Sequence, residues 1–287
     1  MRERYLALIF IAPALILLIG LVAYPFTMSL YMSLTDKRIG GPGTFVGLAN
    51  YVRLLQDDMF QQTIRNTLTY ATAAVSIKTV LGMTLAMCLA AIPRGRRIFR
   101  SVLLLPWVVP TSLSVLAWWW MFEPTLSVVN WVLRGIGVGA VPWLSDPFWA
   151  RVAVVTVNAW RGIPFFAVAF LSGLVSIPTE LYEAAEADGA SAVRAFWSIT
   201  LPLMRPVLAI VVLYSIVMTV GDFEIVYILT RGGPFGRTHL FSTYAFQIGL
   251  HGTEIGLGAA ASLFIFPVLA VASFLMMRVV RAGEQYA

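Results

Sequence analysis

The chain has 287 residues, of which 59% are hydrophobic and 12% are charged, and its mean hydropathy is +0.83. A soluble domain carries about 25% charged residues, so this composition excludes an ordinary soluble protein. The net charge of +6 does not indicate nucleic-acid binding, because the arginines flank apolar runs instead of gathering on a polar segment. Several runs reach the ~20 apolar residues that a membrane-spanning helix needs. We therefore expect an all-α integral membrane protein with six spans in a single domain over residues 1–287.

The first expected span covers about residues 5–34, with kinks near Pro13 and Pro25, and is too long for the apolar core of a signal peptide. Residues 35–65 follow as a polar loop. The second span, about 68–92, has Lys78 near its middle. A charge at that depth is costly unless it faces water or a partner. We expect Lys78 to pair across the helix bundle or to reach an aqueous cavity; direct contact with a solute is the alternative.

Four arginines in residues 93–100 indicate a cytoplasmic anchor. The third span, about 101–122, ends in Trp118–Trp120, a cluster typical of the interfacial aromatic belt, although stacking on a sugar ring is the alternative. Residues 123–148 form a second external loop with an interfacial helix. Arginine and lysine are more frequent in the cytoplasmic segments if both termini are cytoplasmic, so we adopt that orientation.

The fourth span, about 148–175, contains the polar tract Asn158–Phe165. The fifth span, about 207–229, carries Asp222 and Glu224 near its end. The sixth, about 255–280, begins with small residues, including Gly256 and Gly258, that let helices approach closely.

Residues 176–206 separate the fourth and fifth spans and carry turn signals. Pro178 followed by Thr179 predicts a helix start, and Gly189 predicts its end, because glycine adopts the left-handed conformation freely. Ser191 can cap a second short helix over 192–200, which Pro202 is expected to end. The pattern therefore predicts a helix–glycine–helix elbow.

The same loop contains seven signature residues at a fixed spacing. Glu183-Ala184-Ala185, then Gly189 after three residues, then Ile199, Leu201 and Pro202, resemble the EAA signature of bacterial ABC-importer permeases. The phrases at 45–51 and 230–234 resemble the carbohydrate-uptake branch of that family.

This resemblance implies the six-helix permease fold of type I ABC importers, in the cytoplasmic (inner) membrane of a bacterium. The implied function is a non-catalytic subunit that forms the path for a sugar or oligosaccharide. The implied partners are a second homologous permease in a heterodimer, two ATPase subunits that bind ATP and Mg, and an external solute-binding protein. The EAA residues would contact the ATPase.

The resemblance also suggests a solute path, because the tract around Asn158 is similar to the sugar-contacting tract of maltose permeases. The positions that correspond to contacts are Asn158, Trp160, Arg161, Gly162, Phe165, Ser215 and Thr219. Three of them, Arg161, Phe165 and Thr219, depart from the residue types found there, which puts maltose itself in doubt. Simple packing of helix against helix is the alternative.

Motifs for other chemistry are missing from the sequence. There is no phosphate-binding loop for ATP, no catalytic arrangement is visible, and His239 and His251 have no cysteine partner for a zinc site. We therefore expect no cofactor or metal on this chain. The alternative functions are a proton-driven transporter using Asp222 and Glu224, an ABC permease for a polyol or sugar phosphate, and a membrane enzyme acting on lipid-linked sugar, for which we find no motif.

Overall fold

The computed structural model describes residues 2–92, 95–125 and 127–284, and every regular element in this part of the chain is a helix. The expected all-α fold is therefore confirmed. Within these described residues, five helices are long and apolar enough to cross a membrane: Phe10–Ser33, Asp58–Ala91, Pro147–Val175, Ala192–Val220 and Ile255–Arg278. The expected third span, about 101–122, is not among them.

The N-terminal part begins with α1 (Arg2–Leu18), the π-helical turn η1 (Ile19–Ala23) and α2 (Tyr24–Ser33). Pro13 lies inside α1, and Pro25 lies in the first turn of α2. The expected polar loop 35–65 contains a helix that we did not predict, α3 (Ala49–Gln56), which buries Asn50 and Leu54. The next helix, α4 (Asp58–Ala91), begins about ten residues before the expected second span.

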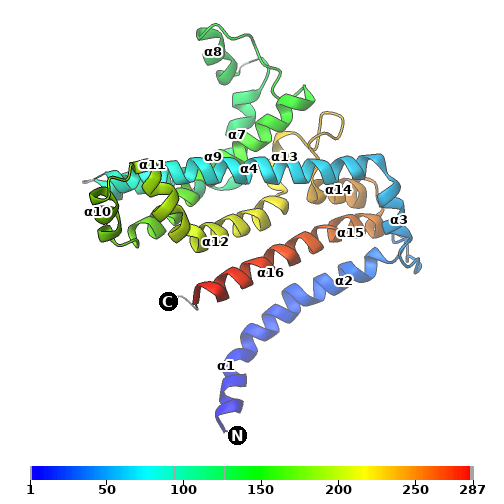
Figure 1. Cartoon of the computed structure of the whole chain (residues 1–287). Coiled ribbons are helices and arrows are strands. Elements are labelled where there is room, and N and C mark those ends of the chain that lie inside the picture. The colour runs from blue at the N-terminus through cyan, green and yellow to red at the C-terminus, as the bar shows by residue number, and fades with distance from the viewer. Residues whose placement is uncertain (1, 93–94, 126, 285–287) are drawn as a thin grey trace. The chain divides into compact units, whose positions relative to one another are not determined.

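The expected third span consists of three short helices, α5 (Arg96–Leu103), α6 (Leu105–Val108) and α7 (Thr111–Phe122). Two prolines explain the breaks: Pro106 occupies the first turn of α6, and Pro110 lies just before α7. A crossing by this segment stays a prediction. The loop after α7 contains α8 (Val128–Gly135), which lies beyond the end of α7 (Figure 1).

The remaining helices, in chain order, are α9 (Pro147–Val175), α10 (Thr179–Ala187), α11 (Ala192–Ala195), the π-helical turn η2 (Phe196–Thr200), α12 (Leu201–Val220), α13 (Glu224–Leu229), α14 (Phe241–Phe246), the π-helical turn η3 (Gln247–His251), α15 (Ile255–Leu263) and α16 (Ile265–Glu284). Asp146 starts α9 by accepting hydrogen bonds from the backbone N–H groups of Phe148 and Trp149.

Pro202 does not end a helix, so that expectation is wrong. The chain is helical from Ala192 to Val220, and Pro202 lies in the first turn of α12. The reason is η2, where the backbone N–H of Leu201 bonds to the carbonyl of Phe196 across the wider π turn. Because a proline in the first turn of a new α-helical segment needs no N–H, the helix continues through it.

The helices form two compact units, one of residues up to Gln61 with Tyr244–Phe266, the other of Gln62–Thr243 with the residues from Pro267 on. In the first unit α15 packs along α2 (Figure 1). Gly256 allows this contact, since a side chain there would meet the carbonyl of Thr35. Gly258 lets α15 approach η3 in the same way, since a side chain there would meet Gly249.

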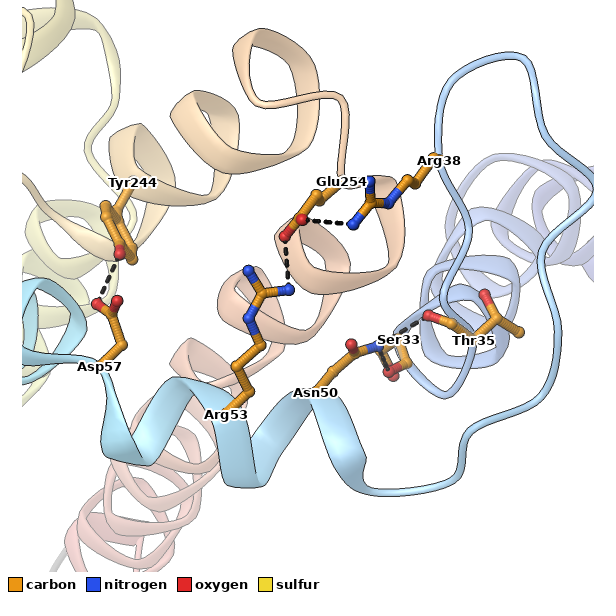
Figure 2. Close-up of polar contacts among 8 residues, drawn as sticks. All are labelled: Ser33, Thr35, Arg38, Asn50, Arg53, Asp57, Tyr244 and Glu254. Atoms are coloured by element: carbon orange, nitrogen blue, oxygen red, sulfur yellow. Dashed lines mark hydrogen bonds and ion pairs between the residues drawn. The ribbon is translucent and has the colours of Figure 1, made fainter.

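Side chains from distant segments lock the loops of the first unit together (Figure 2). The amide of Asn50 donates 2.8 Å hydrogen bonds to the carbonyls of Ser33 and Thr35, which have no partner within α2. The Glu254 carboxylate pairs with Arg38 at 3.0 Å and with Arg53 at 2.8 Å. This cluster gives a structural reason for the sequence phrase at 45–51, because Asn50 closes the end of α2.

Candidate functional site

A cavity of about 460 Å³ lies in the second unit, among α4, the α6–α7 segment, α9, α12 and α13. Its size is within the range of small-molecule binding sites, roughly 300–1,000 Å³. Six of the seven residues predicted for the solute path line it: Asn158, Arg161, Gly162, Phe165, Ser215 and Thr219.

The spacing of these residues along α9 explains why they share a surface. Asn158, Arg161, Gly162 and Phe165 follow the i, i+3, i+4, i+7 pattern of one helix face. Trp160 lies off this face and is not among the lining residues. Its ring packs edge-on against Trp118, with the ring centroids 5.4 Å apart. The predicted role of Trp160 in contacting solute stays a prediction.

Lys78 is buried in this cavity wall and takes part in a network across three helices. Its ammonium group donates hydrogen bonds of 2.9 Å to Oδ1 of Asn158 on α9 and to Oγ1 of Thr219 on α12. The expectation that Lys78 pairs across the bundle is confirmed. The group also lies 5.8 Å from the ring centre of Phe166.

Asp222 supplies the negative charge of the same network. Its Oδ2 accepts hydrogen bonds from the Tyr70 hydroxyl at 2.6 Å and from the Asn158 amide at 3.1 Å. Its Oδ1 accepts from the backbone N–H of Ile225, at the start of α13. The amide of Asn158 thus bridges a cation and an anion, accepting from one and donating to the other. Sequence reasoning noted Lys78, Asn158 and Asp222 separately and did not connect them.

Two glycines let α4 and α9 approach closely enough to form the network. A side chain at Gly162 would occupy the place of the Lys78 stem, and one at Gly82 would meet the Cβ of Phe166. Both pairs differ by the same number of residues, so the two helices run in parallel and in constant register. Gly162 therefore has a packing role, whether or not it also contacts solute.

Aromatic rings form another part of the wall, and sequence reasoning missed two of them. Trp107 stacks on Phe165 with an interplanar angle of 20° and a centroid distance of 5.7 Å. The ring of Tyr214, on α12, also lies beside Phe165, with the two ring centroids 5.5 Å apart. Aromatic rings beside hydrogen-bonding groups suit a sugar-like ring that has apolar faces and hydroxyl groups. Because Trp107 lies far from α9 in the sequence, no spacing rule could have predicted this contact.

Arg161 and Glu224 bring two more charges to the cavity lining. One guanidinium nitrogen of Arg161 lies 3.4 Å from the carbonyl of Val109. Its Nε is buried and makes no hydrogen bond within the described residues. With Lys78 and Asp222, the wall carries two cations and two carboxyl groups.

The elbow of residues 176–206 has the expected first helix and glycine turn. α10 begins after Pro178 and ends with Gly189 at φ +74°. The N–H of Gly189 bonds to the carbonyl of Glu186, and that of Ala190 to the carbonyl of Ala185, which is the Schellman arrangement. Ser191 caps the next helix, as predicted, by accepting from the N–H of Arg194.

The rest of the elbow signature lies where α10 packs onto the following helix. The Tyr182 hydroxyl bonds to that of Thr200 at 2.9 Å, which ties α10 to the π turn η2. Ile199, Leu201 and Pro202 are half-buried around this junction, whereas Glu183 and Ala184 are exposed. The signature therefore has a buried part that shapes the elbow and an exposed part on α10.

The loop after α13 is closed over a buried histidine. The His239 ring occupies the space where Gly232 would carry a side chain, and it lies 3.2 Å from the Thr243 hydroxyl. Burial lowers the pKa of His239 to about 4. The phrase at 230–234 thus serves loop packing, and within the described residues no group of three or more His, Cys, Asp and Glu could hold a metal ion.

Comparison with known proteins identifies the class. Residues 78–283 match the family model described as binding-protein-dependent transport system inner membrane component. The chain belongs to this family and is a non-enzymatic permease subunit of an ABC importer. This assignment excludes a proton-driven transporter and a membrane enzyme.

Particular relatives cover nearly the whole chain. It is 35% identical over 281 residues to the trehalose/maltose transport system permease protein of Thermococcus litoralis, covering 98% of this chain and 95% of that one. It is 33% identical to the sulfoquinovosyl glycerol transport system permease protein of Agrobacterium fabrum, with 98% and 92% covered. A solved bacterial ABC transporter for the acidic polysaccharide alginate shares the fold, with a TM-score of 0.80 at 24% identity over 99% of this chain and 96% of that one.

Proposed function

We propose that this chain forms part of the translocation path of an importer that takes up a sugar or a short oligosaccharide. The carrying observation is the cavity, whose wall contains the adjacent rings of Trp107, Phe165 and Tyr214 together with the polar groups of Asn158, Ser215 and Thr219. Aromatic faces stack on the apolar faces of sugar rings, and amides and hydroxyls bind their hydroxyl groups. The named transport systems of the two similar permeases support a carbohydrate or a glycosylated glycerol as the solute.

The proposed assembly follows from the family. An external solute-binding protein delivers the solute, a second homologous permease completes the path, and two ATPase subunits hydrolyse ATP with Mg on their own chains. Both termini of this chain are cytoplasmic in this proposal, so the elbow faces the ATPase.

The elbow has the surface that such a contact needs. Glu183 and Ala184 are exposed on α10, and two large apolar side chains are exposed on the next helix of the elbow, Val193 at 68% and Trp197 at 64%. A short helix of this kind fits a groove on a partner, with the apolar side chains as anchors. Ala184 keeps the helix thin, and Glu183 can meet a basic group.

The second candidate solute carries an anionic group, such as a sugar phosphate. Arg161 favours it, because its buried Nε has no partner in the described cavity wall. Lys78 does not, because its ammonium group already donates to Asn158 and Thr219.

The experiment is uptake into proteoliposomes that contain the complete complex with ATP inside and the binding protein outside. The solute is first chosen by thermal shift of the binding protein with maltose, trehalose, glycerol 3-phosphate and mannitol. ATP-dependent uptake of a neutral sugar supports the proposal. Uptake confined to glycerol 3-phosphate, lost in Arg161→Gln, would establish the anionic alternative, and uptake of mannitol alone would contradict both.

A further inference from the structure

A second cavity, of about 360 Å³, lies in the same unit on another side of α4 and α9. Its walls are mostly apolar and come from Ala73 and Ile77 on α4 and from Val152 and Val155 on α9. We call this the α4–α9 groove. Phe148 at its edge is 60% exposed, so the groove opens on the outer surface of the unit.

Two arginines stand at one end of the groove, and no acidic residue lines it. Arg151 donates through Nε to the carbonyl of Pro147 at 3.1 Å, and Arg237 donates to the side-chain oxygen of Gln62 at 2.8 Å. These bonds hold both guanidinium groups at the mouth without neutralising them. Among the described residues, the ion pairs within 4.0 Å involve other arginines.

The loop that carries Arg237 is fixed to the start of the groove. Asn66 on α4 donates through its amide to the carbonyls of Gly236 at 3.0 Å and of His239 at 3.2 Å. These bonds hold the loop of Arg237 against α4, at the end of the groove where the two arginines lie.

The length of the groove matches one leaflet of a bilayer. Its lining on α4 extends from Asn66 to Ile77, a rise of roughly 16 Å at 1.5 Å per residue. Half of the hydrocarbon core of a membrane is about 15 Å. α4 and α9 both have the length and hydropathy to cross a membrane. The apolar walls would then lie at acyl-chain depth, and the arginines at headgroup depth.

We propose that the α4–α9 groove binds one acyl chain of an anionic phospholipid, with the lipid phosphate held by Arg151 and Arg237. The apolar walls fit a hydrocarbon chain, and the paired cations without carboxylates favour a headgroup with net negative charge over a zwitterionic one. The other conceivable occupant is a helix of the second permease, which would offer no phosphate to the arginines.

The test is native mass spectrometry of the full chain, purified in detergent with its co-purifying subunits and titrated with phosphatidylglycerol or phosphatidylcholine. We expect tighter retention of phosphatidylglycerol, with a roughly fivefold loss in each of Arg151→Gln and Arg237→Gln. Arg134→Gln, an exposed arginine of α8 outside the groove, is the matched control and should retain wild-type binding. Ala73→Phe fills the groove and should reduce retention of both lipids.

Other results would overturn the proposal. Equal retention of the two lipids by the wild-type protein would remove the headgroup preference, and this measurement needs no variant to fold. Equal retention of free glycerol 3-phosphate would remove the role of the acyl chain. A disulfide formed by added oxidant between Ala73→Cys and a cysteine introduced into the second permease, in protein that retains no lipid, would assign the groove to that subunit.

Discussion

Lys78 and Asp222 place opposite charges in the interior of the second unit without touching each other. Asn158 connects them, with Oδ1 of its amide 2.9 Å from the lysine and Nδ2 3.1 Å from the carboxylate. Such buried groups depend on each other, because removing one leaves the other uncompensated in a medium of low dielectric.

We predict that Lys78→Met lowers the free energy of unfolding of the purified protein by roughly 3 kcal/mol. Asp222→Asn should be destabilising as well, and the double variant should lose less than the sum of the two single losses, since neither charge is then left alone. Denaturant unfolding in detergent, followed by circular dichroism, measures the three values. Strict additivity would show that the two residues do not form one network.

Trp107 and Trp160 offer a direct comparison at the residue scale. Trp107 lines the cavity and stacks on Phe165, whereas Trp160 packs against Trp118 away from the lining. We predict that Trp107→Ala lowers the apparent affinity for solute in proteoliposome uptake by roughly tenfold, because a stacked ring contributes about 1 kcal/mol or more beyond its area. Trp107→Phe should retain most of the affinity. A larger loss in Trp160→Ala than in Trp107→Ala would instead support the original prediction for Trp160.

At the scale of elements, Gly189 determines the direction in which the chain leaves α10. Its φ of +74° is disfavoured for residues with a side chain, most strongly for β-branched ones, and asparagine tolerates it best. We predict that Gly189→Val abolishes uptake while the protein still reaches the membrane, and that Gly189→Asn retains a large part of it. Uptake, ATPase co-purification and ATP hydrolysis are measured on the same preparations. Wild-type values for Gly189→Val would exclude a coupling role for the turn.

The loop around His239 gives the second unit a pH dependence with a definite sign. Because burial lowers the pKa of His239 in the folded protein to about 4 from its ordinary value of 6.5, the unfolded chain binds a proton first as pH falls. Stability should therefore be constant above pH ~6.5 and decrease between pH ~6.5 and ~4, by roughly 3 kcal/mol at most.

We predict that the thermal midpoint of the purified protein falls over this pH window and that His239→Gln makes the decrease shallower. His251→Gln, at an exposed position, is the control and should follow the wild-type curve. An identical pH profile for His239→Gln and wild type would contradict the assignment.

For the whole molecule, the family assignment predicts that energy comes from another chain. The purified polypeptide alone should show no ATP hydrolysis above the level of an empty-vector preparation, because the sequence has no phosphate-binding loop. The assembled complex should hydrolyse ATP, and its binding protein should stimulate the rate. ATP hydrolysis by the isolated chain would refute this prediction if it persisted after contaminating ATPases had been removed.

Sequence reasoning predicted the elements better than the contacts between them. Hydropathy and turn residues located α9, α10 and the glycine turn, because these signals are local in the chain. The sharing of one cavity face by residues 158, 161, 162 and 165 also follows from helical period alone. α3 was missed because an eight-residue amphipathic helix in a polar loop has little hydropathy signal.

The contacts that hold the cavity together could not be predicted from the sequence. The pairing of Lys78 with Thr219 joins positions 141 residues apart. The stacking of Trp107 on Phe165 depends on how α6 packs against α9. Pro202 was misinterpreted for a different reason: the usual rule for proline assumes an α-helical hydrogen-bond pattern, and η2 changes that pattern just before it.

The π turn η2 also affects the direction in which the side chains of the following helix, α12, point. One additional residue within a helix rotates the downstream part by about 100° around the axis, since an α-helix has 3.6 residues per turn. Ser215 and Thr219, which lie on α12 beyond η2, both line the cavity. A one-residue deletion in η2 that turned α12 by this angle would preserve every side chain of the helix and yet move both hydroxyl groups away from the cavity. The direction in which these side chains face is thus coupled to a turn fifteen residues earlier, about 22 Å along the helix, beside the segment that is proposed to meet the ATPase.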